Sequence, residues 1–404
     1  MNSTTIPASS HTFDSAFANA HASVAARIHS VDIVRGFVIV LMALDHVRDF
    51  FSNAKIDLLD PSETTVGLYL TRWITHLCAP TFIFLAGVSA QRMSLRVSTG
   101  ELSRFLLTRG LWLIALEVTV VLAAWSFNVR YQFGVFLQVI WAIGASMVCL
   151  AALAHLKRLT IGAFAVLVIL GHNLLDGIAP AAFGGFAPLW TLLHVQGPFS
   201  LGFVSYPLIP WVAVMALGFV MGAMYDMPVE RRRSLLRRAG IIAITAFVVL
   251  RISNAYGDPN PWVAHGDITA TLMSFFDVEK YPPSLLYLLA TLGLCWLCLA
   301  AAESFGSRLA SGFASVLEVF GRVPLFVYVM HIVVAHLLAG LIAWSMGYGT
   351  TVLTNVFMFF PKEWGFGLPV VYTAWLAVLA LLYPLCRWFG ELKRRRSDWW
   401  LAYL

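Results

Sequence analysis

Six ionisable side chains lie in the first long apolar stretch of the chain, where a membrane-spanning helix normally has very few. Ionisable groups are costly inside a bilayer, so each of them is a candidate functional residue. A histidine in such a place can act as a general base or as a nucleophile near neutral pH. The stretch is SVDIVRGFVIVLMALDHVRDFF, and the six residues are Asp32, Arg35, Asp45, His46, Arg48 and Asp49.

Arg35 and His46 are expected on the same face of this helix. They are 11 residues apart, which in an α-helix corresponds to three turns plus about 20° and to about 16 Å along the axis. Asp49 follows His46 by three residues on that face and could orient the imidazole. Asp45 lies about 100° around the helix and cannot orient His46 from there, but we include it with His46 and Asp49 in the expected catalytic group. The plain alternatives are that His46 marks the outer surface of the membrane and that Arg35 pairs with Asp32.

Two later apolar segments also contain candidate site residues. In YLTRWITHLCAPTFIFLAG, Arg72 and His76 are four residues apart near the outer end, at about the depth of His46. In GRVPLFVYVMHIVVAHLLAG, His331 and His336 are five residues apart and point in different directions. We therefore expect only one of these two histidines, the deeper His331, to belong to a site, while the other packs.

The composition shows that these stretches are membrane helices. Hydrophobic residues make up 59% of the 404 residues, charged residues make up 12%, and the mean hydropathy is +0.79. Soluble proteins carry about 25% charged residues, so a soluble enzyme, a disordered protein and a nucleic-acid binder are excluded. We expect an all-α integral membrane protein with about ten transmembrane helices, each of about 20 residues. The segments lie near 31–50, 71–92, 105–124, 133–154, 159–178, 206–225, 239–253, 284–302, 323–343 and 368–388.

The distribution of basic residues predicts the orientation. If the N-terminus is inside, 20 of the 27 Lys and Arg residues fall on the inner side of these segments and 7 on the outer side. Basic residues gather on the cytoplasmic side of membrane proteins, so both termini are expected in the cytoplasm. The first 30 residues lack the apolar core of a signal peptide. We expect a disordered cytoplasmic tail at 1–29, one transmembrane domain at 30–390 and a basic cytoplasmic tail at 391–404.

Some conspicuous residues have simple packing interpretations. Cys295 and Cys298 form a C-x-x-C in the middle of an apolar helix, where two soft side chains one turn apart are expected to pack. Gly218 and Gly222 form a G-x-x-x-G, which favours the close approach of another helix. No pair of histidines with a carboxylate recurs at metal-ligand spacing, so the sequence implies no metal.

The remaining apolar and loop segments are expected on the outer side. The stretch 350–360 is too short to cross the membrane and ends in proline, so we interpret it as interfacial or re-entrant. The long segments 179–205 and 254–283 are too apolar for disorder and are expected to fold over the outer mouth. Glu117 fits equally well as an ion-pair partner of an arginine such as Arg109 and as a site carboxylate.

Five blocks of sequence carry a family resemblance. The spacing of Arg35, ten residues and His46 resembles the R-x10-H signature of the transmembrane acyltransferase superfamily. The blocks RWITHLCAPTFIFLAG, RISNAYGDPNPW, KYPPSLLYLLATLG and FGRVPLFVYVMHI resemble the bacterial branch related to heparan-alpha-glucosaminide N-acetyltransferase, filed under DUF1624. The resemblance runs from about residue 27 to about residue 390. The large lumenal portion of the lysosomal enzyme is not in this sequence, so the glycosaminoglycan substrate is not carried over.

This resemblance implies an acyl-CoA-dependent O- or N-acetyltransferase of the bacterial cytoplasmic (inner) membrane. Such an enzyme takes an acyl group, usually acetyl, from cytoplasmic acyl-CoA and delivers it to an acceptor on the far side. By the same resemblance, His46 is the catalytic residue and Arg35, together with Arg322, attends the CoA end. The expected partners are the lipid bilayer, acyl-CoA and a saccharide acceptor, and the sequence leaves open whether the chain forms a homodimer.

Two mechanisms remain open at this stage. In the first, His46 removes a proton from the acceptor hydroxyl or amine as it attacks the thioester, and Asp49 stabilises the imidazolium. In the second, His46 carries the acyl group between two half-reactions. The residues expected to hold the acceptor or the developing oxyanion are Arg72, His76, His331, Arg251, Asn254, Tyr256 and Asp258.

A proton-coupled transporter is the alternative from another functional class. Buried His, Asp and Arg residues also form proton relays in transporters. Many transporters are built from two related halves, and no such repeat is evident in this sequence. Consumption of acetyl-CoA distinguishes the enzyme from ligand movement that depends on a pH gradient.

Overall fold

The computed structural model describes residues 28–128, 134–305, 312–396, 398 and 401. Within them the chain is mostly helical, and every one of the ten predicted segments overlaps a helix. The α-helices are α2 (His29–Phe51), α3 (Val66–Trp73), α4 (Cys78–Ser94), α5 (Thr99–Leu116), α6 (Leu122–Ser126), α7 (Val139–Leu153), α8 (Arg158–Gly171), α9 (Ala187–Leu193), α10 (Ile209–Met221), α11 (Val229–Ser253), α12 (Ile268–Phe276), α13 (Leu285–Phe305), α14 (Phe313–Gly321), α15 (Pro324–Ser345) and α16 (Leu368–Arg395).

Shorter turns join several of these helices. The 3-10 turns are η1 (Ile74–Leu77), η3 (His172–Leu175), η4 (Pro180–Phe186), η5 (Gly222–Asp226), η7 (Thr350–Leu353) and η8 (Phe357–Phe359), and η2 (Glu117–Val121) is a π-helical turn. Counted with these turns, seven helices of the described residues are long and apolar enough to cross a membrane. They are Val66–Ser94, Thr99–Ser126, Arg158–Leu175, Ile209–Asp226, Leu285–Ser304, Pro324–Ser345 and Leu368–Arg395.

Three predicted spans are outside this group of seven. Helix α2 is continuous but carries too many charged residues, α11 begins with a run of arginines, and α7 has only 15 residues. The predicted helix 133–154 begins later than expected because Val135–Leu137 form a strand. The predicted tail at 1–29 lies almost entirely outside the described residues, and the start of the predicted tail at 391–404 is the helical end of α16.

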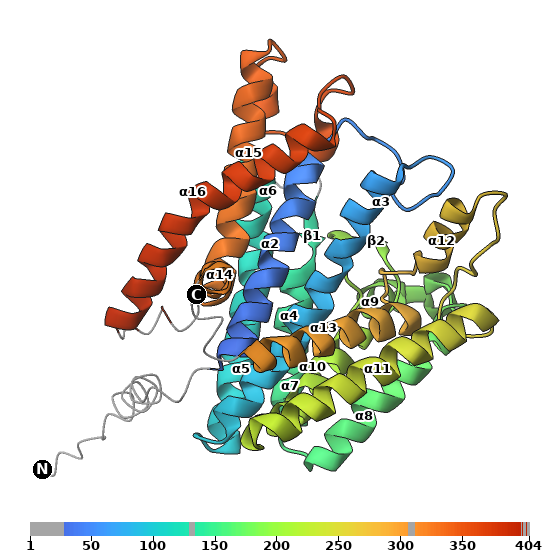
Figure 1. The fold of residues 1–404 in the computed structure, drawn as a ribbon, viewed down its shortest axis with the longest axis vertical. Helices are drawn as coiled ribbons and strands as arrows, with labels where there is room; N and C mark the ends of the chain where they lie inside the picture. Colours follow the sequence, from blue (N-terminus) through green and yellow to red (C-terminus); the bar gives the residue numbers. More distant parts are fainter. Residues whose placement is uncertain (1–27, 129–133, 306–311, 397, 399–400, 402–404) are drawn as a thin grey trace, which may run out of the picture.

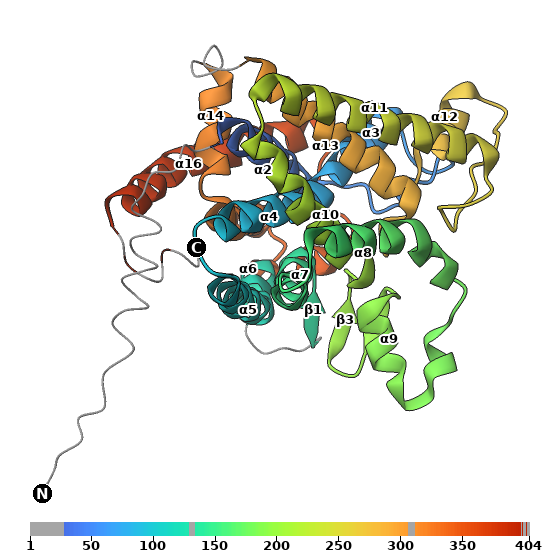
Figure 2. The same ribbon diagram turned by 90° about the horizontal axis from the view of Figure 1, so that it is seen from below.

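Helix α2 lies inside the helical assembly. It packs against α4 and α13 on one side and against α14, α15 and α16 on the other (Figures 1 and 2). Most of its residues are therefore buried, including the apolar residues Val38, Ile39 and Val47 between the charged positions. This central position brings residues far apart in the sequence to the side chains of α2.

Glycines allow the closest helix crossings. A Cβ atom on Gly36 of α2 would collide with the backbone carbonyl of Leu317 in α14, and one on Gly321 would collide with the carbonyl of Asp32. A Cβ atom on Gly218 would collide with the backbone carbonyl of Phe84 in α4, and one on Gly222 would collide with the side chain of Gln91 in the same helix. The G-x-x-x-G therefore serves close helix packing, as its spacing predicts.

The predicted second helix contains a tighter 3-10 turn in the structure. Pro80 has no backbone N–H, so the carbonyl of His76 four residues earlier receives no helical hydrogen bond. The hydroxyl of Tyr287 donates to that carbonyl at 2.8 Å instead. The 3-10 turn is η1, between α3 and α4.

A small sheet and two loop segments cover one end of the helices. Strand β3 (Gly202–Val204) pairs in parallel with β1 (Val135–Leu137) and antiparallel with β2 (Gly197–Phe199). The sheet, the end of the segment 254–283 and the segment 350–360 all contribute residues to one large cavity. The segments 254–283 and 350–360 therefore form part of the wall of this cavity, and 350–360 contains only two short turns, η7 and η8. That the cavity opens on the outer side of the membrane stays a prediction.

Candidate active site

His46 of α2 and His331 of α15 form a pair. His46 Nδ1 lies 2.6 Å from His331 Nε2, and the two rings are stacked with centroids 4.9 Å apart. His331 Nδ1 lies 2.8 Å from the carbonyl oxygen of Val327. A carbonyl oxygen only accepts, so His331 Nδ1 carries a proton. In the neutral pair, His331 Nε2 then accepts a hydrogen bond from His46 Nδ1–H, which leaves the lone pair on Nε2 of His46.

Aromatic side chains surround this pair. The ring of Trp125 meets His46 edge-on with centroids 4.9 Å apart, and the ring of Tyr328 lies 6.3 Å away. His331 is fully buried. The imidazole of His46 is therefore held on three sides and has little freedom to turn.

A network of four charged residues lies next to His46. Asp45 binds Arg48 at 2.8 Å and Arg72 at 3.0 Å, and Arg48 also binds Asp49 at 2.7 Å. Asp49 thus pairs with Arg48, and the ring partner of His46 is His331 rather than Asp49. Asp45, which cannot reach His46 along α2, holds Arg72 of α3 in place.

The large cavity, which we call the outer cavity after the predicted orientation, has a volume of about 1320 Å³. His46 and all four members of this network line it. Lys280 and Tyr281 line it as well, and the ammonium of Lys280 lies 5.1 Å from the centre of the Tyr281 ring. Burial opposes ionisation of the Tyr281 phenol, but the cations Lys280 and Arg72 offset it and hold its pKa below the usual value. Lys280 and Arg72 therefore lie close enough to Tyr281 to act on its phenol, and the cavity lining as a whole holds three cations and three carboxylates.

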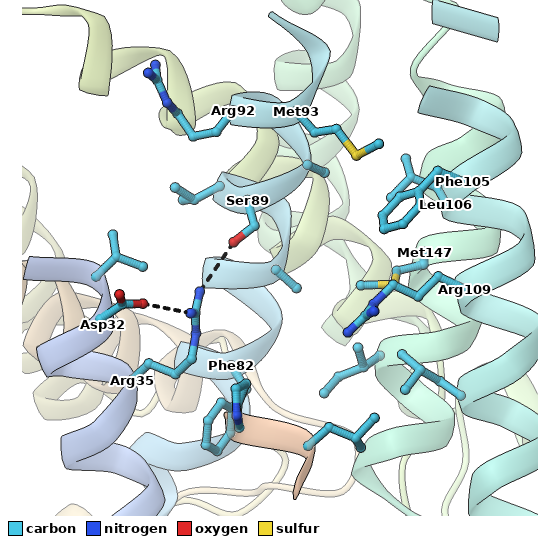
Figure 3. A pocket seen from close by; sticks show the side chains of 18 of the residues that line it. Asp32, Arg35, Phe82, Ser89, Arg92, Met93, Phe105, Leu106, Arg109 and Met147 are labelled. Atoms are coloured by element: carbon cyan, nitrogen blue, oxygen red, sulfur yellow. Dashed lines mark hydrogen bonds and ion pairs between the residues drawn. The ribbon is translucent and has the colours of Figure 1, made fainter. Parts of the chain in front are cut away.

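A second cavity, which we call the inner cavity, has a volume of about 540 Å³ and lies toward the arginine-rich ends of the helices. Six cationic side chains line it against one carboxylate, that of Asp32. Arg35 donates to Asp32 and to Ser89 at 3.2 Å each, and Figure 3 shows Arg109 reaching into the cavity from the side opposite Arg35. The cations are Arg35, Arg92, Arg96, Arg109, Arg322 and Lys393.

The two cavities approach each other at His46. Met42 lines the inner cavity and lies one turn before His46, which lines the outer cavity. Tyr328 also lines the inner cavity while its ring faces that of His46. Arg35 and Met42 line the inner cavity and His46 lines the outer cavity. The face of α2 on which the sequence predicts Arg35 and His46 therefore passes from one cavity to the other.

Comparison with protein families agrees with this geometry. The profile of the family described as heparan-alpha-glucosaminide N-acetyltransferase, catalytic, matches residues 27–253, more than half of the chain. The chain belongs to this acetyltransferase family. The profile of the OpgC protein family matches residues 186–388, and no curated protein gives a significant match. Together with the seven apolar helices, membership of this acetyltransferase family makes the chain a multi-pass membrane protein related to acyltransferases.

Four residues expected to hold the acceptor make hydrogen bonds within or next to the segment 254–283. Arg251 donates to the carbonyl oxygens of Asn260 at 2.7 Å, Phe275 at 2.9 Å and Ser274 at 3.0 Å, and also to that of Asp277. Such a set of bonds fixes the path of the segment. The four residues are Arg251, Asn254, Tyr256 and Asp258, and none of them lines either cavity.

The bonds of the other three members of this group are also local. Asn254 exchanges two hydrogen bonds with the backbone of Trp262, and the hydroxyl of Tyr256 donates to the Leu170 carbonyl. Asp258 accepts from Ser284 at 2.6 Å, and burial raises the pKa of its carboxyl. Sequence spacing did not reveal these roles because each partner is a backbone group or lies in another element.

The remaining candidates divide between the site and the packing around it. Arg72 lines the outer cavity, whereas His76 is buried outside both cavities against Tyr287. His336 packs between the rings of Phe127 and Phe50.

Glu117 has neither of the two roles considered for it. Its carboxylate accepts a hydrogen bond of 2.8 Å from the backbone N–H of Trp141. That N–H belongs to the first turn of α7, which has unpaired N–H groups. Glu117 therefore caps α7, and its π-helical turn positions it to do so.

Sequence reasoning missed Trp125, Lys280 and Tyr281 as site residues. Trp125 comes directly after the predicted segment 105–124, at the end of an apolar helix where a tryptophan is unremarkable. Lys280 and Tyr281 are in the block KYPPSLLYLLATLG, so a basic residue next to an aromatic one at the start of a helix was the available signal.

Proposed function

We propose that this protein transfers an acyl group, in the first instance acetyl, from acyl-CoA in the inner cavity to a hydroxyl or amine in the outer cavity. The observation that carries the proposal is that the two cavities approach each other at His46. The inner cavity then faces the cytoplasm and the outer cavity faces the other side of a bacterial inner membrane. Both termini are cytoplasmic in this arrangement.

The inner cavity suits the CoA end of the donor. CoA carries several phosphate charges, and arginine binds phosphate oxygens with its planar set of N–H groups. Arg35 and Arg322, the two residues assigned to CoA by family resemblance, both line this cavity, and Arg109 faces Arg35 across it. The apolar wall beyond them, including Phe82 and Met147, would take the uncharged arm that leads the thioester toward His46.

His46 is the proposed base. Its Nε2 lone pair is fixed by the bond from Nδ1–H to His331, which is the arrangement a general base needs. The same nitrogen would be the nucleophile in the covalent route, in which the acyl group rests on His46 before it reaches the acceptor. His331 replaces Asp49 as the residue that orients the ring in either route.

The outer cavity suits a saccharide acceptor. Aromatic rings line it together with polar groups, and sugar rings stack on aromatic faces while their hydroxyls bind polar side chains. Arg72 is held by Asp45 at the edge of this cavity. The lining rings are Trp125, Phe136, Phe203, Tyr206, Tyr281, Phe357 and Phe359.

The test uses detergent-purified protein and acetyl-CoA, with binding and slow hydrolysis as the two measurements. His46→Ala should abolish hydrolysis while leaving binding intact, and Arg35→Gln should weaken binding by about tenfold because it removes a charged contact. The matched controls are His155→Ala and Arg231→Gln, since both residues are exposed and line neither cavity. A folded native protein that neither binds nor hydrolyses acetyl-CoA would contradict the proposal and would direct attention to transport assays.

A further inference from the structure

The hydroxyl group of Tyr328 has no hydrogen-bond partner among the described residues. Tyr328 is only 3% exposed, so its hydroxyl is removed from bulk water. Buried polar groups are normally paired, because an unpaired one loses its bonds to water without replacement. Phenylalanine would fill the same space without this loss. The tyrosine at this position therefore needs an explanation other than packing.

Tyr328 occupies the place where the two cavities approach each other. It lines the inner cavity together with Met42 and Leu325. Its ring lies 6.3 Å from the ring of His46 and 5.8 Å from that of His331, measured between centroids. It is on the same helix as His331, one turn earlier. A thioester that extends from the inner cavity to His46 would pass this side chain.

We propose that the Tyr328 hydroxyl donates a hydrogen bond to the carbonyl oxygen of the acyl group while that oxygen carries negative charge. This rests on the proposed acyl transfer and adds a catalytic residue to it. Hydrogen-bond donors aimed at a developing oxyanion are among the largest contributions to acyl-transfer rates. An unpaired, buried hydroxyl is well prepared for this, because it breaks no existing bond to reach the substrate.

The electrons and protons balance in this step. The nucleophile's lone pair attacks the carbonyl carbon, and the C=O π electrons move to the oxygen, which accepts the hydrogen bond from Tyr328. When the C=O bond re-forms, the C–S bond breaks and CoA leaves as its thiolate with that electron pair. The proton of the acceptor passes to Nε2 of His46 and then to water, so Tyr328 remains protonated throughout.

This proposal differs from the expectation drawn from the sequence. There, Arg72 was among the residues expected to hold the acceptor or the developing oxyanion. In the structure the guanidinium of Arg72 is bound to Asp45 at the edge of the outer cavity. Tyr328 instead approaches from the inner cavity, where the thioester would lie before the reaction.

The test is Tyr328→Phe, measured for acetyl-CoA turnover, acetyl-CoA binding and thermal unfolding. We expect kcat to fall by about 10²-fold or more, with unchanged binding and a melting temperature that is unchanged or higher. The pH dependence of the remaining activity should keep its shape, because Tyr328 transfers no proton. The control is Tyr69→Phe, since Tyr69 is equally buried at 3% but donates to the Met273 carbonyl and lines neither cavity. It should lower the melting temperature and leave turnover unchanged.

The contradicting results are distinct. Native turnover in Tyr328→Phe would overturn the assignment while leaving the proposed function intact. Loss of one limb of the pH profile would overturn it as well, because that result would make Tyr328 a proton donor to the thiolate. Absence of turnover in the native protein would overturn the proposed function and this assignment with it.

Discussion

The imidazole of His46 takes its useful tautomer from a second histidine. The chain of bonds from the Val327 carbonyl through His331 leaves the lone pair of His46 on Nε2. A side chain that orients a catalytic imidazole commonly has a large effect on rate, since the wrong tautomer presents N–H instead of a lone pair. In the proposed reaction His331 is therefore a positioning residue whose influence passes through His46.

The substitution His331→Ala should lower kcat for acyl-CoA turnover by about 10²-fold, with little change in KM, because it removes the acceptor for His46 Nδ1–H. His331→Gln should restore part of the rate, since a side-chain amide oxygen can accept the same bond. Steady-state kinetics of both variants checks this. Equal loss in the two variants, together with a lower melting temperature, would show that His331 acts only through packing.

Sequence reasoning reached the individual residues of the site more reliably than their partners. The positions of Arg35 and His46 on one face follow from helix periodicity alone, and both line the cavities. The partner of His46 could not be derived in this way, because His331 is 285 residues away. The same limitation explains Arg251, whose four carbonyl partners lie in a loop of no regular pattern.

At the scale of elements, the crossing of α2 and α14 determines where the catalytic helix lies. Gly36 allows the two backbones to meet, and any side chain there would collide with the Leu317 carbonyl. Alanine normally stabilises a helix interior relative to glycine by about 1 kcal/mol. At this position the collision must outweigh that preference, since backbone atoms cannot move aside as a flexible side chain can.

We expect Gly36→Ala to destabilise the protein by about 1–3 kcal/mol, the usual cost of overpacking, and to lower turnover because α2 carries His46. The control Gly162→Ala, in α8, should be neutral or stabilising, because its Cβ would lie 3.7 Å from the nearest neighbouring atom. Thermal unfolding in detergent compares the two variants. Equal melting temperatures for both would contradict the role given to this crossing.

The predicted helices correspond well to the observed ones because a long apolar run must satisfy its own backbone hydrogen bonds within a membrane. The departures have local causes. Pro80 removes a helical hydrogen bond next to the 3-10 turn in the second helix. Pairing with β3 makes Val135–Leu137 a strand. A single stretch of sequence shows neither the strand that pairs with Val135–Leu137 nor the tyrosine that binds the His76 carbonyl.

The segment 254–283 is expected to respond to pH through Asp277. Burial, with the neighbouring carboxylate of Asp258, raises the pKa of the Asp277 carboxyl to about 7. Its pKa in an unfolded chain is about 3.9. Between these two values the folded state binds more protons than the unfolded state, so stability falls as the pH rises. Above about pH 7 the carboxyl is ionised in both states, and its effect on stability no longer changes with pH.

The measurement is the melting temperature between pH 5 and pH 8 for the native protein and for Asp277→Asn, which stays uncharged. The native protein should lose stability over this range more steeply than the variant. The control is Glu363→Gln, because it removes an exposed carboxylate that is not among the groups shifting the pKa of Asp277, so the slope of the native protein should remain. Identical pH profiles for the native protein and Asp277→Asn would show that this carboxyl does not titrate in the folded state as described.

At the scale of the whole molecule, the proposed reaction joins two sides of a membrane. In this proposal the donor enters among the cations that line the inner cavity, the acceptor enters the outer cavity, and the two meet at His46, near which the cavities approach each other. Lys393, near the end of α16, lines the inner cavity, so a tag at the C-terminus marks the face on which the donor must bind. This two-sided arrangement distinguishes the account from a one-sided hydrolase.

The most direct test uses sealed vesicles that hold the purified protein, selected so that the C-terminal tag faces outward. Acetyl-CoA labelled in its acetyl group is added outside, with water as the acceptor, at a pH where acetate is ionised. The account predicts that label accumulates inside the vesicles and free CoA outside, and that His46→Ala abolishes both. Release of label and CoA on the same side, or normal turnover in His46→Ala vesicles, would contradict the claim that the acyl group crosses at His46.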